Sequence, residues 1–180
     1  HVLSPLATNQ ALALPILALL VSGGPTQLIL SRQWLKYEIV GDTQDDAAGE
    51  AFDKVARLLG LPYPGGPALS ALAAHAPNIE HRVFNLPRPM LHSGDLNFSF
   101  SGLKTAVLYR LKEAPQLAKP ALAQEFQQAV IDVLIAKTLT ATKCYQPKSV
   151  VLTGGVAANQ PLRQQLTATL QKAHPALLVF

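Results

Sequence analysis

The chain has 180 residues, of which 49% are hydrophobic and only 14% charged, which predicts a globular protein with one sizeable core and excludes a disordered chain. Its net charge of +4 comes from scattered residues, and no basic run predicts a nucleic-acid-binding arm. The single cysteine, Cys144, excludes an intramolecular disulfide, and with no targeting signal or bilayer-length apolar run visible we expect a cytoplasmic protein without a membrane partner.

The first part of the chain predicts a short helix followed by strands. The helix covers residues 2–13 and is ended by Pro15. A continuous apolar run and two segments with strand-type side chains predict three strands joined by tight turns, over residues 16–21, 26–30 and 34–40. Three short strands joined in this way suggest a meander.

The rest of the chain predicts helices and then helices alternating with strands. Apolar residues at helical spacing predict helices over residues 47–59 and 121–145, and two further helices are expected over residues 68–75 and 101–111. Residues 77–97 contain three prolines and are predicted to be mostly loop. Further along, the pattern predicts a buried strand over 149–152, a helix over 159–172 and a strand over 177–180. This order indicates an α/β domain.

Two glycine pairs follow predicted strands. The first lies in the run Leu20-Val21-Ser22-Gly23-Gly24, where missing Cβ atoms let backbone N–H groups approach an anion closely, although a tight hairpin turn is the favoured interpretation of this run alone. The second, Gly154-Gly155, precedes a helix that begins near Asn159, whose amide either caps the helix or binds a ribose. Two such turns in one domain could hold a nucleotide from two sides.

An acidic cluster lies near the start of the helix predicted over residues 47–59. Asp45 and Asp46 are placed to complement the dipole of that helix. Asp53 lies too far along it, and either pairs with Arg57 or binds ligand hydroxyls. The loop Tyr63-Pro64-Gly65-Gly66-Pro67 is either a structural turn or a place where backbone approaches a ligand.

In the alternating run Asn97-Phe98-Ser99-Phe100-Ser101, we expect both phenylalanines to pack in the core, and the serines to face either a ligand or simply water, of which water is favoured.

Five motifs together resemble the catalytic subunit of bacterial-type tRNA threonylcarbamoyladenosine transferases. They are, in chain order, Ser22-Gly23-Gly24-x-Thr26-Gln27, Asp45 to Lys54, Gly60 to Pro67, Phe98 to Thr105, and Gly154 to Asn159. The resemblance covers nearly the whole chain. It implies an α/β fold of the actin-like (ribonuclease H-like) type, in which a mixed sheet is flanked by helices. Residues 1–14 would end the N-terminal lobe or form a linker helix, and residues 15–180 would form a C-terminal nucleotide-binding lobe that is incomplete at its end.

The resemblance also implies an activity and a site. The family transfers a threonylcarbamoyl group from threonylcarbamoyl-adenylate to the exocyclic amine of the adenosine beside the tRNA anticodon, and it works with a paralogous partner subunit and a small ATPase. No catalytic side chain is assigned, because the substrate is already activated. The substrate-binding positions that carry over are Leu20, Val21, Ser22, Gly23, Gly24, Asp53, Gly66, Gly154, Gly155 and Asn159.

The family uses a divalent metal, iron or zinc, held by two histidines and an aspartate. His1 matches the second histidine, and the other two ligands would lie outside the chain. We therefore expect the chain alone neither to hold the metal nor to be active. Pro25 stands where bacterial members usually have a histidine.

Two alternatives stay open on the sequence. The first is a non-catalytic paralogous partner or interaction module of the same fold, and the second is another enzyme of that fold, such as a small-molecule carbamoyltransferase or a sugar kinase.

Overall fold

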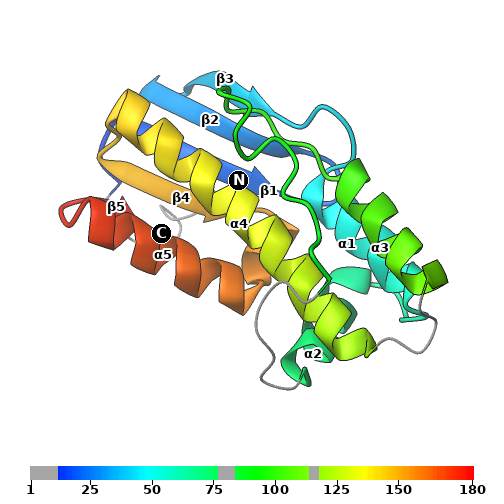
Figure 1. Cartoon of the computed structure of the whole chain (residues 1–180). Coiled ribbons are helices and arrows are strands. Elements are labelled where there is room, and N and C mark those ends of the chain that lie inside the picture. Colours follow the sequence, from blue (N-terminus) through cyan, green and yellow to red (C-terminus); the bar gives the residue numbers. More distant parts are fainter. Residues whose placement is uncertain (1–11, 77–83, 114–117) are drawn as a thin grey trace.

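The structure, a computed structural model, describes residues 12–76, 84–113 and 118–180 (Figure 1). Its strands are β1 (Ile16–Val21), β2 (Thr26–Gln33), β3 (Lys36–Asp42), β4 (Ser149–Thr153) and β5 (Leu178–Val179). Its helices are α1 (Ala48–Leu58), α2 (Gly65–Ala74), α3 (Ser101–Glu113), α4 (Lys119–Tyr145), the short 3₁₀ helix η2 (Gly155–Ala158) and α5 (Gln160–Ala173). None of the helices within the described ranges is long and apolar enough to cross a membrane.

The five strands form one mixed sheet in the order β3-β2-β1-β4-β5. The pairs β1–β2 and β2–β3 are antiparallel, which confirms the predicted meander, whereas β4 runs parallel to β1 and β5 parallel to β4. In the register of β1 with β4, Leu20 lies opposite Thr153. The carboxyl ends of these two neighbouring strands therefore meet at one edge of the sheet.

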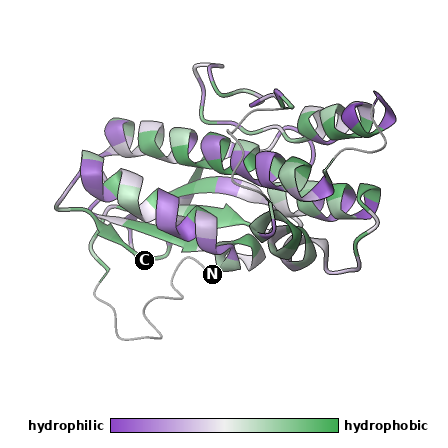
Figure 2. Ribbon diagram, turned by 60° about the horizontal axis from the view of Figure 1, so that its bottom comes forward, coloured by the Kyte–Doolittle hydropathy of each residue, from purple (hydrophilic) through white to green (hydrophobic). Residues whose placement is uncertain are grey.

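Successive side chains of β1 point to opposite faces of the sheet. Leu17, Leu19 and Val21 join the large core beneath the helices, whereas Ile16 and Ala18 join a smaller cluster on the opposite face. Figure 1 shows α4 and α5 lying across one face of the sheet. The central strands are almost entirely hydrophobic, while the helices carry residues of both kinds (Figure 2). Each fully buried leucine of this core contributes about 1.5–3 kcal/mol to stability.

Several element boundaries differ from those predicted, and β2, for example, extends to Gln33 rather than residue 30. β3 begins at Lys36 rather than residue 34, because Trp34 and Leu35 form the hairpin turn and Leu35 has a positive φ of 62°. α2 begins at Gly65 rather than residue 68, since the first turn of a helix tolerates Pro67. Of the helix predicted over residues 2–13, residues 2–11 lie outside the described part, and residues 12 and 13 are not helical.

The long helix α4 holds the loop before α3 through two buried charges. The Glu125 carboxylate, on a residue that is 4% exposed, accepts hydrogen bonds from the backbone N–H groups of Phe84 and Leu86, both at 2.7 Å. A carboxylate that accepts two N–H bonds satisfies the polar groups that burial would otherwise leave unpaired. Glu125 therefore fixes the path of the loop against the core.

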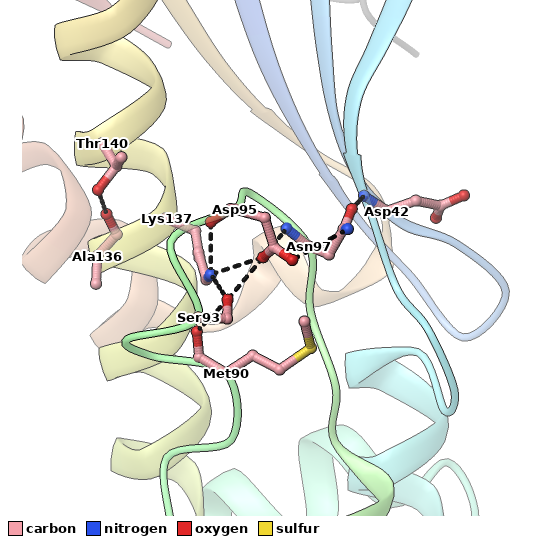
Figure 3. A network of polar contacts seen from close by, with 8 residues as sticks. All are labelled: Asp42, Met90, Ser93, Asp95, Asn97, Ala136, Lys137 and Thr140. Carbon is pink, nitrogen blue, oxygen red and sulfur yellow. Dashed lines mark hydrogen bonds and ion pairs between the residues drawn. The ribbon is translucent and has the colours of Figure 1, made fainter.

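The second buried charge, Lys137, fastens the same loop closer to the sheet (Figure 3). Its Nζ atom donates to Ser93 Oγ at 2.8 Å and to the Asp95 carbonyl at 2.7 Å, and it forms an ion pair with Asp95 Oδ1 at 3.2 Å. Asn97, which donates its backbone N–H to Asp95, accepts a hydrogen bond from the Asp42 N–H at the end of β3. The network thus joins α4 to β3 through the loop.

Asp45 has a different role from the one predicted. Its carboxylate accepts hydrogen bonds from the Phe100 and Ser101 N–H groups, at 2.8 and 3.3 Å, and so stabilises the start of α3 rather than that of α1. The hydroxyls of Ser99 and Ser101 also donate to Asp45, each at 2.6 Å, so the prediction that they simply face water was wrong. The two phenylalanines are fully buried, as predicted.

These bonds change the acidity of Asp45. Burial opposes ionisation, but the hydrogen bonds from Ser101, Ser99 and Phe100 outweigh it and hold the pKa of the Asp45 carboxyl below its ordinary value of 3.8. A group whose pKa is lower in the folded state contributes stability above its unfolded pKa and loses that contribution as the pH falls through the folded value.

Replacing Asp45 by alanine should lower the free energy of unfolding by about 1 kcal/mol at neutral pH, the usual effect of losing a helix cap. The difference from the unsubstituted chain should be constant from pH 7 to pH 5, should begin to shrink near pH 3.8, and should be lost as the pH falls through the lowered pKa of Asp45 in the folded chain. Urea unfolding at several pH values measures this difference in the free energy of unfolding. Glu113→Ala is the control, because it removes an exposed carboxylate from α3, the helix whose start Asp45 stabilises. A difference that persists unchanged at pH 3 would contradict the assignment.

Candidate functional site

The turn after β1 is held by its own residues. Ser22 donates its backbone N–H to the Pro25 carbonyl at 3.0 Å, and its hydroxyl donates to the same oxygen at 3.1 Å. The hydroxyl also accepts from the Gly24 N–H at 3.2 Å. The hairpin interpretation of this motif is therefore correct, and the Ser22 hydroxyl is engaged within the turn.

The start of α1 packs directly on this turn. The Gly49 N–H donates to the Ser22 carbonyl at 3.0 Å, and a Cβ atom on Gly49 would lie 2.5 Å from that oxygen. The Thr26 hydroxyl, at the start of β2, accepts from the Ala48 N–H at 2.9 Å. The glycine lets the helix approach the strand end, so the partial positive charge of the α1 N-terminus lies beside the first glycine pair.

The second glycine pair lies next to the first. Gly154 has a φ of +97°, and a Cβ atom there would lie 2.3 Å from the Val21 carbonyl oxygen of β1. Gly155 opens η2, and Asn159 then caps α5 by accepting the Leu162 N–H at 3.0 Å. The capping interpretation of Asn159 is thus confirmed, and both turns lie at the carboxyl edge of the two parallel strands, where open α/β sheets bind ligands.

A pocket of about 750 Å³ opens in front of this edge, and its walls come from both glycine turns, α1, α2, α4 and the start of α5. Most of the lining is small or apolar, and the polar side chains in it carry carboxylate, hydroxyl or amide groups. No lysine, arginine or histidine lines the pocket among the described residues. The lining comprises Gly23, Gly49, Phe52, Asp53, Pro64, Gly66, Pro67, Ser70, Ala71, Ala73, Ala74, Gln124, Gln127, Gly155, Val156, Ala158, Asn159, Gln160 and Pro161.

A second hollow of about 780 Å³ lies at the other end of the sheet, beside Pro147, Lys148 and His174. The Nε2 atom of His174 is buried there without a hydrogen-bond partner. This hollow lies at the amino end of β4, where parallel strands do not usually place ligands, and it contains neither glycine turn. The pocket at the carboxyl edge is therefore the candidate site.

The substrate-binding positions named from the sequence divide into two groups. Five of them line the pocket, namely Gly23, Asp53, Gly66, Gly155 and Asn159. The other five are not part of its lining and belong to β1 or to the two glycine turns, namely Leu20, Val21, Ser22, Gly24 and Gly154. The metal-ligand candidate His1 lies outside the described residues.

Asp53 does not pair with Arg57 in the described part, and its contact with ligand hydroxyls stays a prediction. Its Oδ1 atom accepts the Gly65 N–H at 2.9 Å and thereby orders the start of α2. No ion pair joins it to Arg57 within the described ranges, whereas Lys54 pairs with Asp46 at 2.6 Å and with Glu50 at 2.9 Å. Asp53 therefore positions the Gly-Gly-Pro backbone at one wall of the pocket.

Sequence reasoning missed four polar residues of the site, Ser70, Gln124, Gln127 and Gln160, of which Ser70 on α2 and Gln127 on α4 bond to each other. Gln127 Oε1 accepts from the Ser70 hydroxyl and from Asn159 Nδ2, both at 2.8 Å, and Asn159 Nδ2 also donates to Ser70 Oγ at 3.0 Å. The two glutamines at 127 and 128 lie within an apolar helical pattern and give no signal in the sequence. Only the packing of α2 and α5 against α4 brings these residues together.

The described residues contain no group of three or more His, Cys, Asp and Glu side chains that could hold a metal ion. The polar groups of the pocket are one carboxylate, one hydroxyl and several amides, which is not the donor set of a metal site. Instead, the arrangement offers backbone N–H groups and amides for binding a small, mainly apolar ligand with a few polar atoms.

Replacing Gly154 by alanine should lower the free energy of unfolding by about 2 kcal/mol or more, because the methyl group would strain a positive φ and collide with the Val21 carbonyl. Gly155→Ala is the matched control, since it has no atom within 4 Å of the added Cβ and no positive φ. Thermal and urea unfolding compare the two variants. Equal stability of both would contradict the close approach of the two strand ends.

Known proteins resemble this chain over most of its length. A family model described as tRNA N6-adenosine threonylcarbamoyltransferase matches residues 1–179. The transferase of that name from Bordetella petrii is 53% identical over 177 residues, which are 95% of this chain and 50% of the relative. The one from Burkholderia mallei is 52% identical over 182 residues, 96% of this chain and 51% of the relative. The chain thus spans about half the length of the curated relatives it matches.

Among solved structures, component A of the (R)-2-hydroxyglutaryl-CoA dehydratase from Acidaminococcus fermentans superposes with a TM-score of 0.52 at 17% identity, covering 92% of this chain and 53% of that protein. This likeness concerns the fold alone and confirms the expected actin-like class. The match over nearly the whole chain and the identity to both relatives show that the chain belongs to the tRNA N6-adenosine threonylcarbamoyltransferase family.

Proposed function

We propose that this chain supplies the nucleotide-binding part of a transferase that moves a threonylcarbamoyl group from threonylcarbamoyl-adenylate to the exocyclic amine of the adenosine beside the tRNA anticodon. The observation that carries the proposal is the pocket between the two glycine turns, at the carboxyl ends of β1 and β4. The names of the relatives support the choice of reaction. Residues 15–180 would form the nucleotide-binding lobe, and residues 1–14 would belong to the preceding lobe or to a linker.

The lining of the pocket suits an adenylate. Small and apolar residues such as Phe52, Ala74 and Val156 offer a surface for a flat base. No cationic side chain is available there for a polyphosphate within the described part. A single phosphate is matched by backbone N–H groups at Gly23 and Gly155 together with the N-terminus of α1. The pocket therefore favours a nucleoside monophosphate or its ester over a triphosphate.

The reaction needs positioning more than a protein nucleophile. The exocyclic amine attacks the carbamoyl carbon, the bond from that carbon to the phosphate oxygen breaks, and the amine loses a proton while AMP leaves. Negative charge grows on the leaving phosphate, where backbone N–H groups and a helix N-terminus stabilise it. In this proposal Gly23 and Gly155 hold the leaving group, and Asp53 and Asn159 fix the walls around it.

The partners and the metal of the full-length protein are part of the proposal. tRNA, a paralogous partner subunit and a small ATPase would act with it in the cytoplasm, as the family resemblance implies. A divalent metal, iron or zinc, would be held outside the described residues, with His1 as one ligand. Since the described residues do not fit a metal, no step of the reaction is assigned to one here.

A chimaera tests the proposal most directly. In it, this chain replaces the matching half of the Bordetella petrii relative. With that protein's own partner proteins, the chimaera should form threonylcarbamoyladenosine in tRNA, measured by mass spectrometry of digested tRNA, whereas the 180-residue chain alone should form none. A folded chimaera that makes no product under conditions where the parent does would overturn the proposal.

Within the chimaera, Asn159→Ser should lower the transfer rate about tenfold or more, because serine still caps α5 but removes the amide from the pocket. Gln171→Ala, an exposed change on the same helix, should leave the rate unchanged. Thermal unfolding of both variants verifies that the fold is intact. Equal rates for the two variants would remove Asn159 from the site.

The isolated chain should retain no stoichiometric iron or zinc after gel filtration in metal-free buffer. A lone histidine at position 1 cannot supply the three protein ligands that a catalytic metal site needs. Mass-spectrometric metal analysis measures the ratio of metal to protein. One tightly held metal ion per chain would show that the ligand set is present here after all.

A further inference from the structure

One residue of the pocket, Gln127, is held in a single orientation by its neighbours. It projects from α4, is 7% exposed, and accepts two hydrogen bonds on Oε1, from Ser70 Oγ and Asn159 Nδ2. Both bonds measure 2.8 Å. A side-chain amide with two bonds on one oxygen has no freedom to exchange its oxygen and nitrogen.

The helix α5 sets the direction of this chain of bonds. The Leu162 N–H can only donate, so the Asn159 oxygen that caps it must be Oδ1. The other atom of the Asn159 amide is therefore the nitrogen, which donates to Gln127, and the Gln127 atom that receives it must be the oxygen. By elimination, the Gln127 nitrogen is left as a donor, and it has no partner among the described residues.

That nitrogen belongs to a residue that lines the pocket, in a wall of mostly apolar groups. The nitrogen is not one of the buried polar atoms that lack a partner in the described part, so it opens onto the pocket, where a ligand that displaces water must supply an acceptor. On a purine, the unprotonated ring nitrogens are such acceptors, whereas the amino group is a donor. At Gln127 the pocket therefore offers the ligand a hydrogen-bond donor and not an acceptor.

We propose that Gln127 is a specificity-determining residue, whose Nε2 donates a hydrogen bond to an unprotonated ring nitrogen of the bound base. The inference rests on the proposed nucleotide function and adds to it the residue and the atom that contact the base. Ser70 and Asn159 are the positioning residues, because they fix which end of the Gln127 amide faces the ligand.

The orientation can be tested without any ligand. In the chain labelled with ¹⁵N-glutamine, the side-chain N–H₂ signal of Gln127 should exchange with solvent at the rate of a group open to the pocket. Asn159→Asp keeps the cap but turns the donor toward Gln127 into an acceptor, so the Gln127 amide should turn over and donate to the new carboxylate. Its N–H₂ signal should then shift and exchange several-fold more slowly. An unchanged signal in this variant would overturn the orientation.

The contact with the base is tested with AMP at millimolar concentration, which suits weak binding by an open lobe. AMP should shift the Gln127 N–H₂ signal. Of the 1-deaza, 3-deaza and 7-deaza analogues, each of which lacks one ring nitrogen, one should leave that signal unmoved and bind about tenfold more weakly.

Paired variants separate the donor from its surroundings. Gln127→Glu preserves the shape and the acceptor for Ser70 and Asn159 but replaces the donor, and it should weaken AMP binding about tenfold. Gln124→Glu adds the same charge to the same wall one turn earlier on α4, so it measures the effect of charge alone, and Gln127→Glu should weaken binding several-fold more than this control does.

The outcomes distinguish the two proposals. If AMP shifts the Gly155 and Asn159 signals but not that of Gln127, or if all three deaza analogues bind as AMP does, the nucleotide pocket stands and the role of Gln127 fails. Equal losses in Gln127→Glu and Gln124→Glu would also overturn it, since charge alone would then explain the effect. If AMP shifts no signal of the pocket, the pocket assignment fails and the Gln127 contact fails with it.

Discussion

The contact between Gly154 and the Val21 carbonyl is the constraint on which the candidate site depends. It brings the ends of β1 and β4 so close that no side chain fits between them, and Gly49 does the same between α1 and the turn after β1. Three pieces of bare backbone therefore converge at one edge of the sheet. Backbone N–H groups become available to a ligand there because glycine leaves the space in front of them free.

Around this edge, polar side chains from other positions order the helix starts. Thr26 accepts an N–H from the start of α1, Asp53 from the start of α2 and Asp45 from the start of α3, while Asn159 caps its own helix α5. Each such bond is worth about 1 kcal/mol, and each also sets where a helix begins relative to the sheet. The acidic cluster is therefore mainly a means of positioning α2 and α3, and the walls of the pocket follow from it.

Much of this could be predicted from local patterns. Apolar runs and helical spacing predicted every strand and α-helix of the described ranges, since the period of side-chain burial is a property of neighbouring residues. The cap at Asn159 was foreseen as one of two interpretations, because its partner Leu162 lies only three positions away. The motifs around the glycine turns also indicated the family, and the comparisons confirm it.

What the sequence by itself determined is thus the set of elements, the family and the local caps. The tertiary structure alone decided the partners of Asp45, Asp53 and Gln127. Asp45 and Ser99 are 54 positions apart, and Ser70 and Gln127 are 57 apart, so no local pattern relates them. Such pairs form because the sheet and helices pack in one way, and burial then requires each polar group to find whichever partner that packing brings near.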